Sequence, residues 1–140
     1  LVEATQKKAE FLNWMTTRLG LADVEVLAER AETVARRDKY RETFDLATAR
    51  AIGPLTLVLE LTLPLCKIGG VLLAQRGGDS EAEAARAMRA ASTLGGDDPY
   101  VEPPVPGSGA RGSITIVRKI AKTSERFPRR DGIPSKRPLV

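Results

Sequence analysis

Short runs of apolar and β-branched residues alternate along the chain with segments of helical period, and this alternation constrains the fold most strongly. Helices are predicted after Thr5, where apolar residues recur every three or four positions, after Gly53-Pro54, and after Asp79-Ser80. The predicted strands are 1–3, 24–28, 44–49, 71–74, 100–105 and 113–119. Strands that alternate with helices form βαβ units, so we predict an α/β fold with a mainly parallel sheet.

Some chemistries are excluded by what the sequence lacks. It has one cysteine, Cys66, and no histidine in 140 residues. An internal disulfide framework, a Ser-His-Asp triad, a Cys-His pair and a histidine-ligated zinc are therefore impossible, and no metal is predicted. No apolar run reaches the roughly 20 residues of a membrane-spanning helix. A lone thiol and the lack of an export signal favour a cytoplasmic location.

Positive charge is concentrated at the end of the chain. Residues 118–140 hold eight basic and two acidic side chains, a net +6 within a total of +4, so residues 1–117 carry −2. We therefore expect a domain at 1–119 and a basic, proline-rich, extended arm at 120–140, facing a polyanionic partner. A merely solvated tail is the alternative. The residues expected to contact phosphates are Arg129, Arg130, Lys136 and Arg137, while Phe127 either stacks on a base or anchors the arm.

Ligands of open α/β sheets bind beyond the carboxyl ends of the strands, which directs attention to two acids. Glu3 ends a predicted strand and precedes a helix, where a carboxylate accepts hydrogen bonds from ribose hydroxyls, or simply complements the helix dipole. Ala31-Glu32 follows the next strand, at a loop that flanks adenine in nucleoside-binding folds. A solvated loop acid is the alternative there.

Two arginines also follow predicted strands. Arg50 lies between a buried strand and a buried helix, where an unpaired charge is costly, so it should hold a carboxylate of a ligand or of Asp45. Arg76, in Arg76-Gly77-Gly78, is a candidate phosphate contact, although such a sequence is also common in surface loops. The chain has no Gly-x-Gly-x-x-Gly and no Walker loop.

Five segments, in order and along the whole chain, carry a family resemblance: LVEATQKKAEFL (1–12), RAE (30–32), ATARAIGPL (47–55), LPLCKIGG (63–70) and RFPRRDGIPSKRPL (126–139). Together they resemble the bacterial small-subunit ribosomal RNA guanine-N7 methyltransferases of the RsmG, or GidB, type. The resemblance implies a Rossmann-like class I methyltransferase fold that binds S-adenosylmethionine. It implies that Glu3, Ala4 and Thr5 lie on the ribose side, Ala31 and Glu32 on the adenine side, and that Arg50 contacts the cofactor.

The sequence departs from the family pattern in two places. The acidic-Gly-x-Gly loop and the first strand of the family are absent, so we expect a partial fold with half of the cofactor site. The family also often has Lys-Gly at Arg76-Gly77, which keeps the charge but not the geometry. These residues alone are therefore expected to be inactive.

The resemblance implies methylation of guanine N7 in 16S ribosomal RNA by the full-length enzyme. The implied partner is 16S rRNA or a precursor of the small ribosomal subunit, and we expect a monomer. Two alternatives stay open: a truncated, non-catalytic RNA-binding fragment, and a class I methyltransferase with a small-molecule substrate. The basic arm argues against the small-molecule substrate.

Overall fold

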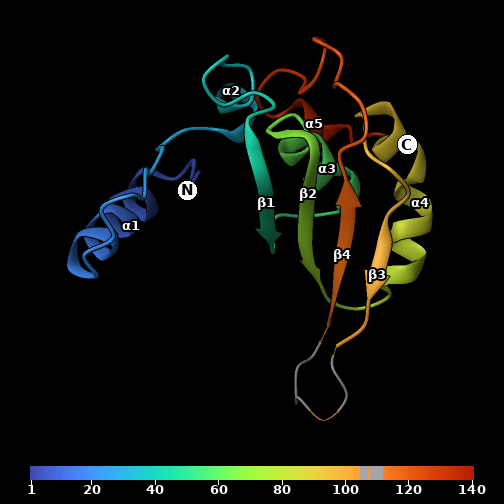
Figure 1. Cartoon of the computed structure of the whole chain (residues 1–140), viewed down its shortest axis with the longest axis horizontal. Helices are drawn as coiled ribbons and strands as arrows, with labels where there is room; N and C mark the ends of the chain where they lie inside the picture. Colours follow the sequence, from blue (N-terminus) through green and yellow to red (C-terminus); the bar gives the residue numbers. More distant parts are fainter. Residues whose placement is uncertain (105–106, 108–111) are drawn as a thin grey trace.

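A four-stranded sheet forms the centre of the computed structural model, which describes residues 1–104, 107 and 112–140 (Figure 1). Its strands are β1 (Phe44–Arg50), β2 (Cys66–Arg76), β3 (Tyr100–Glu102) and β4 (Ser113–Arg118), in the order β1-β2-β4-β3. β1 and β2 are parallel, whereas β4 is antiparallel to both β2 and β3. The expected mainly parallel sheet is therefore wrong for the described strands. β3 and β4 follow each other in the sequence with too few residues between them for the crossover that a parallel pair needs.

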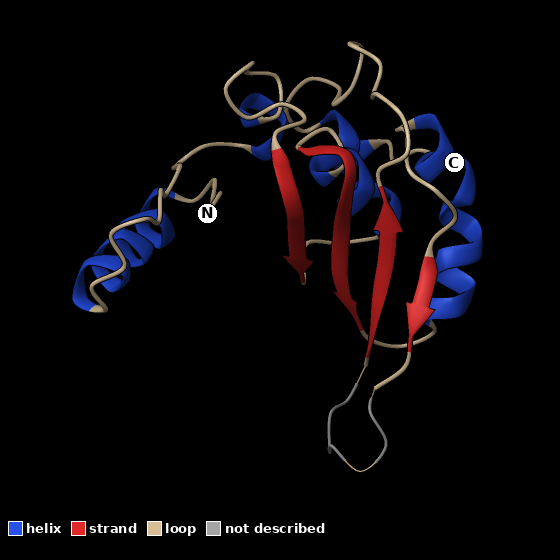
Figure 2. Cartoon of the chain, in the orientation of Figure 1, coloured by secondary structure: helices blue, strands red, loops and turns tan. Residues whose placement is uncertain are grey.

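Helices cover one face of this sheet and leave the other open (Figure 2). α3 (Leu55–Thr62) packs on β1 and β2, and α4 (Ser80–Thr93) packs on β3 and β4. The short α5 (Ile133–Lys136) lies against α3. α1 (Gln6–Arg18) stands away from the sheet, and α2 (Ala31–Val34) lies beside the start of β1.

The apolar core lies between the sheet and α3 and α4. Alternate residues of β2 and β4 face the helices, as the pleat requires: Leu72 and Val117 are fully buried there. The small residues Ala87 and Ala91 let α4 approach closely, and Leu59 fills the centre from α3. This packing fixes the ends of β1 and β2, where ligands are expected.

The helix ends follow local sequence signals. Asp79 caps α4 by accepting a hydrogen bond from the Ala82 amide, as predicted. Gly20 adopts a positive φ just beyond α1, also as predicted. Pro64 follows the end of α3 by two residues and cannot continue the helix.

The predicted turn at residues 67–70 lies within β2 as a bulge. Phe44 pairs with Cys66 but Leu46 pairs with Val71, so the register shifts there. Gly69 has φ +85°, and a Cβ on Gly70 would lie 2.9 Å from the Phe44 carbonyl oxygen. The two glycines allow the chain to bulge against β1 without leaving the sheet.

Two predicted strands near the N-terminus are not formed. Residues 1–3 and 24–28 contribute a single parallel bridge, between Val2 and Leu27. β1 was expected to be buried, but it is an edge strand whose Leu46 is 50% exposed. Among the described residues, β2 is the only strand that pairs with β1. The backbone N–H and C=O groups on the other edge of β1 therefore have no strand partner there.

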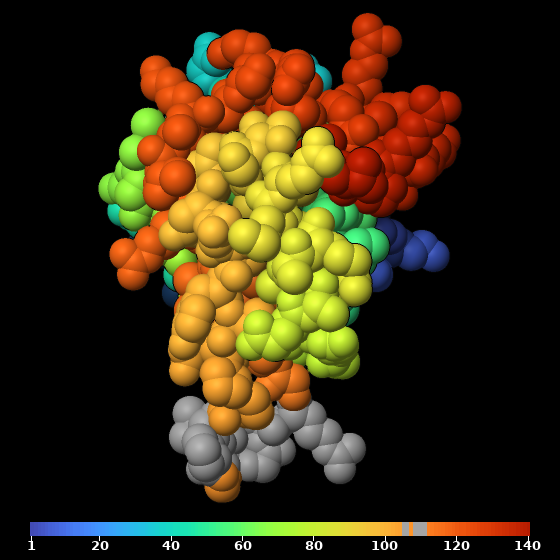
Figure 3. All heavy atoms as spheres, turned by 90° about the vertical axis from the view of Figure 1, so that its right-hand side faces the viewer, coloured from blue at the N-terminus to red at the C-terminus, as the bar shows by residue number. Residues whose placement is uncertain are grey.

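Residues 120–140, called the arm below, fold back onto the domain and do not form an extended tail. Phe127 and Thr123 are buried, and the arm covers the upper part of the molecule beside α4 (Figure 3). Phe127 therefore anchors the arm. Val105, the predicted end of β3, lies outside the described residues. No helix in the described part of the chain is long and apolar enough to span a membrane.

Candidate cofactor and RNA sites

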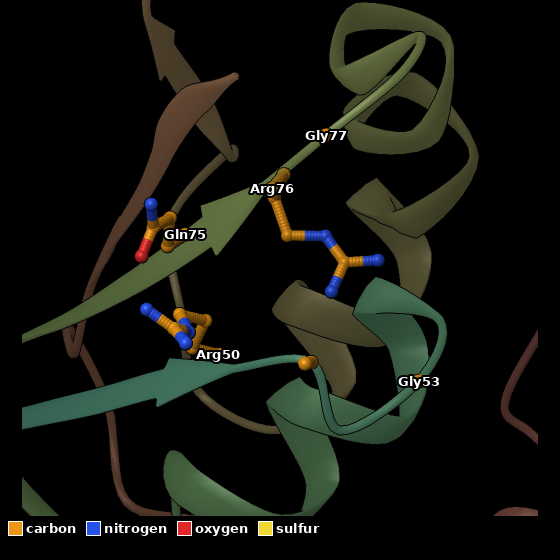
Figure 4. Close-up of a pocket in the computed structure, with 6 residues that line it drawn as sticks. Arg50, Gly53, Gln75, Arg76 and Gly77 are labelled. Atoms are coloured by element: carbon orange, nitrogen blue, oxygen red, sulfur yellow. The ribbon is translucent and has the colours of Figure 1, made fainter. Parts of the chain in front are cut away.

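A hollow of about 530 Å³ lies at the carboxyl ends of β1 and β2. It is lined by Arg50, Ala51, Gly53, Gln75, Arg76 and Gly77. Arg50 pairs with Gln75 across the two strands, and their side chains project to the same side, while Arg76 projects toward α3 and α4 (Figure 4). The sequence predicted both arginines at this edge, and the structure places both there.

Arg50 presents an exposed guanidinium at this hollow. Asp45, the internal partner considered from the sequence, instead pairs with Lys67. No ion pair or hydrogen bond joins the Arg50 side chain to another residue within 1–104, 107 and 112–140. This guanidinium can therefore grip a carboxylate or phosphate of a ligand.

Arg76, the candidate phosphate contact, is paired with an acid of the protein. Its Nε donates to Glu83 Oε2 over 2.9 Å and its terminal nitrogen donates to Oε1 over 2.7 Å. Both side chains are largely buried, with exposed fractions of 13% and 20%. These bonds use two of the five N–H donors of its guanidinium, so the contact of Arg76 with a phosphate stays a prediction.

Glu3, Ala4 and Thr5 lie at the start of α1, outside the hollow. Glu3 Oε1 accepts a hydrogen bond from the Thr5 amide over 2.7 Å, and this bond lowers the pKa of the Glu3 carboxyl. Thr5 is at the N-cap position but its side chain makes no capping bond. In this structure the Glu3 carboxylate thus accepts a backbone hydrogen bond at the N-terminus of α1.

Ala31 and Glu32 begin α2, which lies at the opposite end of β1 from Arg50 (Figure 1). Glu32 is buried, and its Oε1 accepts the Gly132 amide of the arm over 3.0 Å. The structure therefore does not bring Glu32 and Arg50 into one hollow. The adenine role of Ala31-Glu32 stays a prediction.

The arm is attached through backbone amides that donate to three glutamates on other elements. These pairs are Thr123 N to Glu42 (2.7 Å), Arg129 N to Glu60 (2.8 Å) and Gly132 N to Glu32 (3.0 Å). Arg41 adds hydrogen bonds to the carbonyl oxygens of Thr123 and Phe127. The arm is consequently part of the folded unit.

Arg129, which was expected to contact RNA, is paired with an acid of the protein. Its guanidinium donates to both oxygens of Glu60, over 2.9 Å and 2.6 Å, and Glu60 is fully buried on α3. A buried carboxylate requires a charged partner, and Arg129 supplies it. The lone acid in the apolar run 55–65 was the sequence signal for this pair.

Lys119, counted in the basic end of the chain, is buried as well. Its ammonium donates to the Leu63 carbonyl over 2.8 Å and to Thr123 Oγ1, and pairs with Glu42. Desolvation lowers the pKa of Lys119, an effect that Glu42 opposes. Partial burial raises the pKa of Glu42, but hydrogen bonds from Thr123 and Lys119 outweigh it and lower that pKa.

Three of the predicted RNA contacts remain exposed on the arm: Arg130, Lys136 and Arg137. Arg126 is exposed too, and its guanidinium lies 4.9 Å from the centre of the Phe127 ring. Together with the exposed Lys122, these residues form the available basic surface of the arm. No cluster of metal-ligating side chains occurs within the described residues.

The fold is that of class I methyltransferases. An rRNA methylase from Streptococcus thermophilus has a TM-score of 0.60 at 13% identity, over 86% of this chain and 72% of that one. A SAM-dependent O-methyltransferase from Thermotoga maritima has a TM-score of 0.62 at 12% identity, over 88% and 50%. The fold class predicted from the sequence is thus confirmed.

The family follows from sequence similarity. Residues 1–102 match the family described as rRNA small subunit methyltransferase G, and this chain belongs to it. A relative of that name from Chloroflexus aggregans is 51% identical over 99% of this chain and 58% of its own length. Another, from Dehalococcoides mccartyi, is 42% identical over 100% and 60%. The chain therefore spans about 60% of the length of these curated relatives.

Proposed function

We propose that this chain forms the larger part of an S-adenosylmethionine-dependent methyltransferase that methylates N7 of a guanine in 16S ribosomal RNA. The observation that carries the proposal is the 51% identity, over nearly the whole chain, to a relative named for small-subunit rRNA methylation. The proposed partner is 16S rRNA or a small-subunit precursor. The enzyme acts as a monomer in the cytoplasm, where that RNA lies.

The chemistry suits a chain without histidine. Guanine N7 carries a lone pair and no proton, so it can accept a methyl group without a general base. S-adenosylmethionine supplies the methyl group on a sulfonium. The protein then has to place guanine N7 in line with the methyl carbon and the sulfur, and to exclude water. Contacts from backbone groups and arginines can do this.

The hollow fits one end of this cofactor. The guanidinium of Arg50, which has no partner among the described residues, can hold the carboxylate of the methionine moiety. None of its lining residues carries a carboxylate that could accept hydrogen bonds from the ribose hydroxyls. We therefore propose that the chain holds part of the cofactor site.

The cofactor proposal is tested by affinity. Calorimetric titration of the 140-residue chain with S-adenosylmethionine should give weak or no binding. A chimera in which this chain replaces the matching segment of the Chloroflexus aggregans relative should bind the cofactor and methylate 16S rRNA. The Arg50→Ala chimera should lose both. Micromolar affinity of the isolated chain, or an inactive chimera, contradicts the proposal.

RNA binding is tested on the exposed residues alone. Replacing Arg130, Lys136 and Arg137 with alanine should weaken binding of a 16S rRNA fragment and reduce the salt slope by about 2, at about 0.7 per phosphate contact. The matched control replaces three exposed basic residues of α1: Lys7, Lys8 and Arg18. Equal losses in both variants would indicate nonspecific attraction, and no loss would favour a small-molecule substrate.

A further inference from the structure

α3 begins at a residue that cannot cap it. Pro54 occupies the N-cap position, and its side chain has no hydrogen-bond acceptor. The next residue, Leu55, is fully buried, so its amide needs an acceptor from elsewhere. Glu83 of α4 provides it: Oε1 accepts the Leu55 amide over 2.9 Å. A carboxylate there also complements the helix dipole.

The same carboxylate binds Arg76 at the end of β2. Glu83 receives both donors of the Arg76 fork while it accepts the Leu55 amide. One side chain thus joins the end of β2, the start of α3 and the first turn of α4. Since Arg76 and the segment leading to α3 line the hollow, Glu83 lies directly behind two of its walls.

The segment between β1 and α3 adopts an unusual backbone conformation. Ala51 has φ +55° and Gly53 has φ +148°. Alanine rarely adopts a positive φ, so such a conformation persists only where its surroundings fix it. Strand pairing of Arg50 with Gln75 fixes one end of the segment, and the Glu83–Leu55 hydrogen bond fixes the other.

We propose that Glu83 is a positioning residue for the cofactor end of the hollow. By holding Arg76 and the start of α3, it maintains the 51–54 turn, whose Ala51 and Gly53 line the hollow beside Arg50. It thereby keeps the shape of the site in which Arg50 binds the carboxylate of the ligand. This inference rests on the proposed function. It assigns Glu83 no contact with substrate or cofactor.

The test uses the chimera described above, with S-adenosylmethionine and 16S rRNA as substrates. Glu83→Ala should raise KM for S-adenosylmethionine about tenfold or more, because a small misplacement of a binding group is costly, and leave KM for RNA unchanged. kcat should stay within about threefold, since the reacting atoms are not touched. Glu83→Gln should restore part of the loss, because its amide oxygen can still accept the Leu55 amide. Glu81→Ala, an exposed acid in the same turn, should match the wild type.

Hydrogen exchange gives a second measurement that needs no activity. In the 140-residue chain, Glu83→Ala should accelerate exchange of the Leu55 amide and of residues 51–53, whereas Glu81→Ala should not. Unchanged exchange, or equal rises in KM for cofactor and RNA, overturns the role of Glu83. If Arg50→Ala abolishes cofactor use while Glu83→Ala is silent, the proposed function stands and this inference fails. If the wild-type chimera methylates no RNA, the proposed function fails, and exchange alone decides the role of Glu83.

Discussion

Replacing Arg129 with alanine is expected to lower the free energy of unfolding by about 3–5 kcal/mol, the usual cost of removing one partner of a buried ion pair. Glu60 is fully buried and would keep one donor, the backbone amide of residue 129, in place of a charged fork. Urea denaturation of the 140-residue chain, followed by circular dichroism, measures the loss.

Arg130 is the matched control for this variant. It is the next residue and is exposed, so Arg130→Ala should change the unfolding free energy by less than about 0.5 kcal/mol. Replacing Glu60 and Arg129 together with leucine should recover much of the loss, because no buried charge is then left unpaired. If Arg129→Ala and Arg130→Ala unfold at the same denaturant concentration, the pair is not structural.

Lys119→Met is expected to destabilise the chain by about 3 kcal/mol, within the range for breaking buried pairs. The variant keeps an apolar stem of similar size but removes the donors to Leu63, Thr123 and Glu42. Lys122→Met, at an exposed position nearby, is the control. Thermal or urea unfolding at neutral pH compares the two, and equal midpoints would contradict the prediction.

The pH dependence of the unfolding free energy tests the Lys119–Glu42 pair in a second way. Because the folded-state pKa of Glu42 is lowered, its stabilising contribution is complete above the ordinary carboxyl pKa and is lost as pH falls through the folded value. The wild type should therefore lose more stability on acidification than Lys119→Met, in which one cause of that lowered pKa is gone.

Local signals in the sequence were sufficient for much of the fold. The Asp79 cap, the glycine after α1 and the β-branched run of β4 each depend on a few neighbouring residues, and all were predicted correctly. The strand expected at 24–28 was not, because a strand exists only with a partner, and its alternation does not specify one.

The candidate site was predicted only in part, because some of its contacts join residues that are far apart in the sequence. Strand ends locate Arg50 and Arg76 at one edge, but nothing local shows that Glu83 occupies the Arg76 fork. Glu60 and Arg129 are 69 positions apart, so only the tertiary structure pairs them. Net charge identified the end of the chain as basic, but it did not show that Lys119 and Arg129 form ion pairs inside the protein.

The attachment of the arm through main-chain amides has an evolutionary consequence. Thr123 and Gly132 are gripped by glutamates at atoms that every residue except proline possesses. Mutation can therefore alter the outward-facing charges of the arm without undoing its docking. The position of the arm and the charges that it presents depend on different atoms, so either can change while the other stays the same.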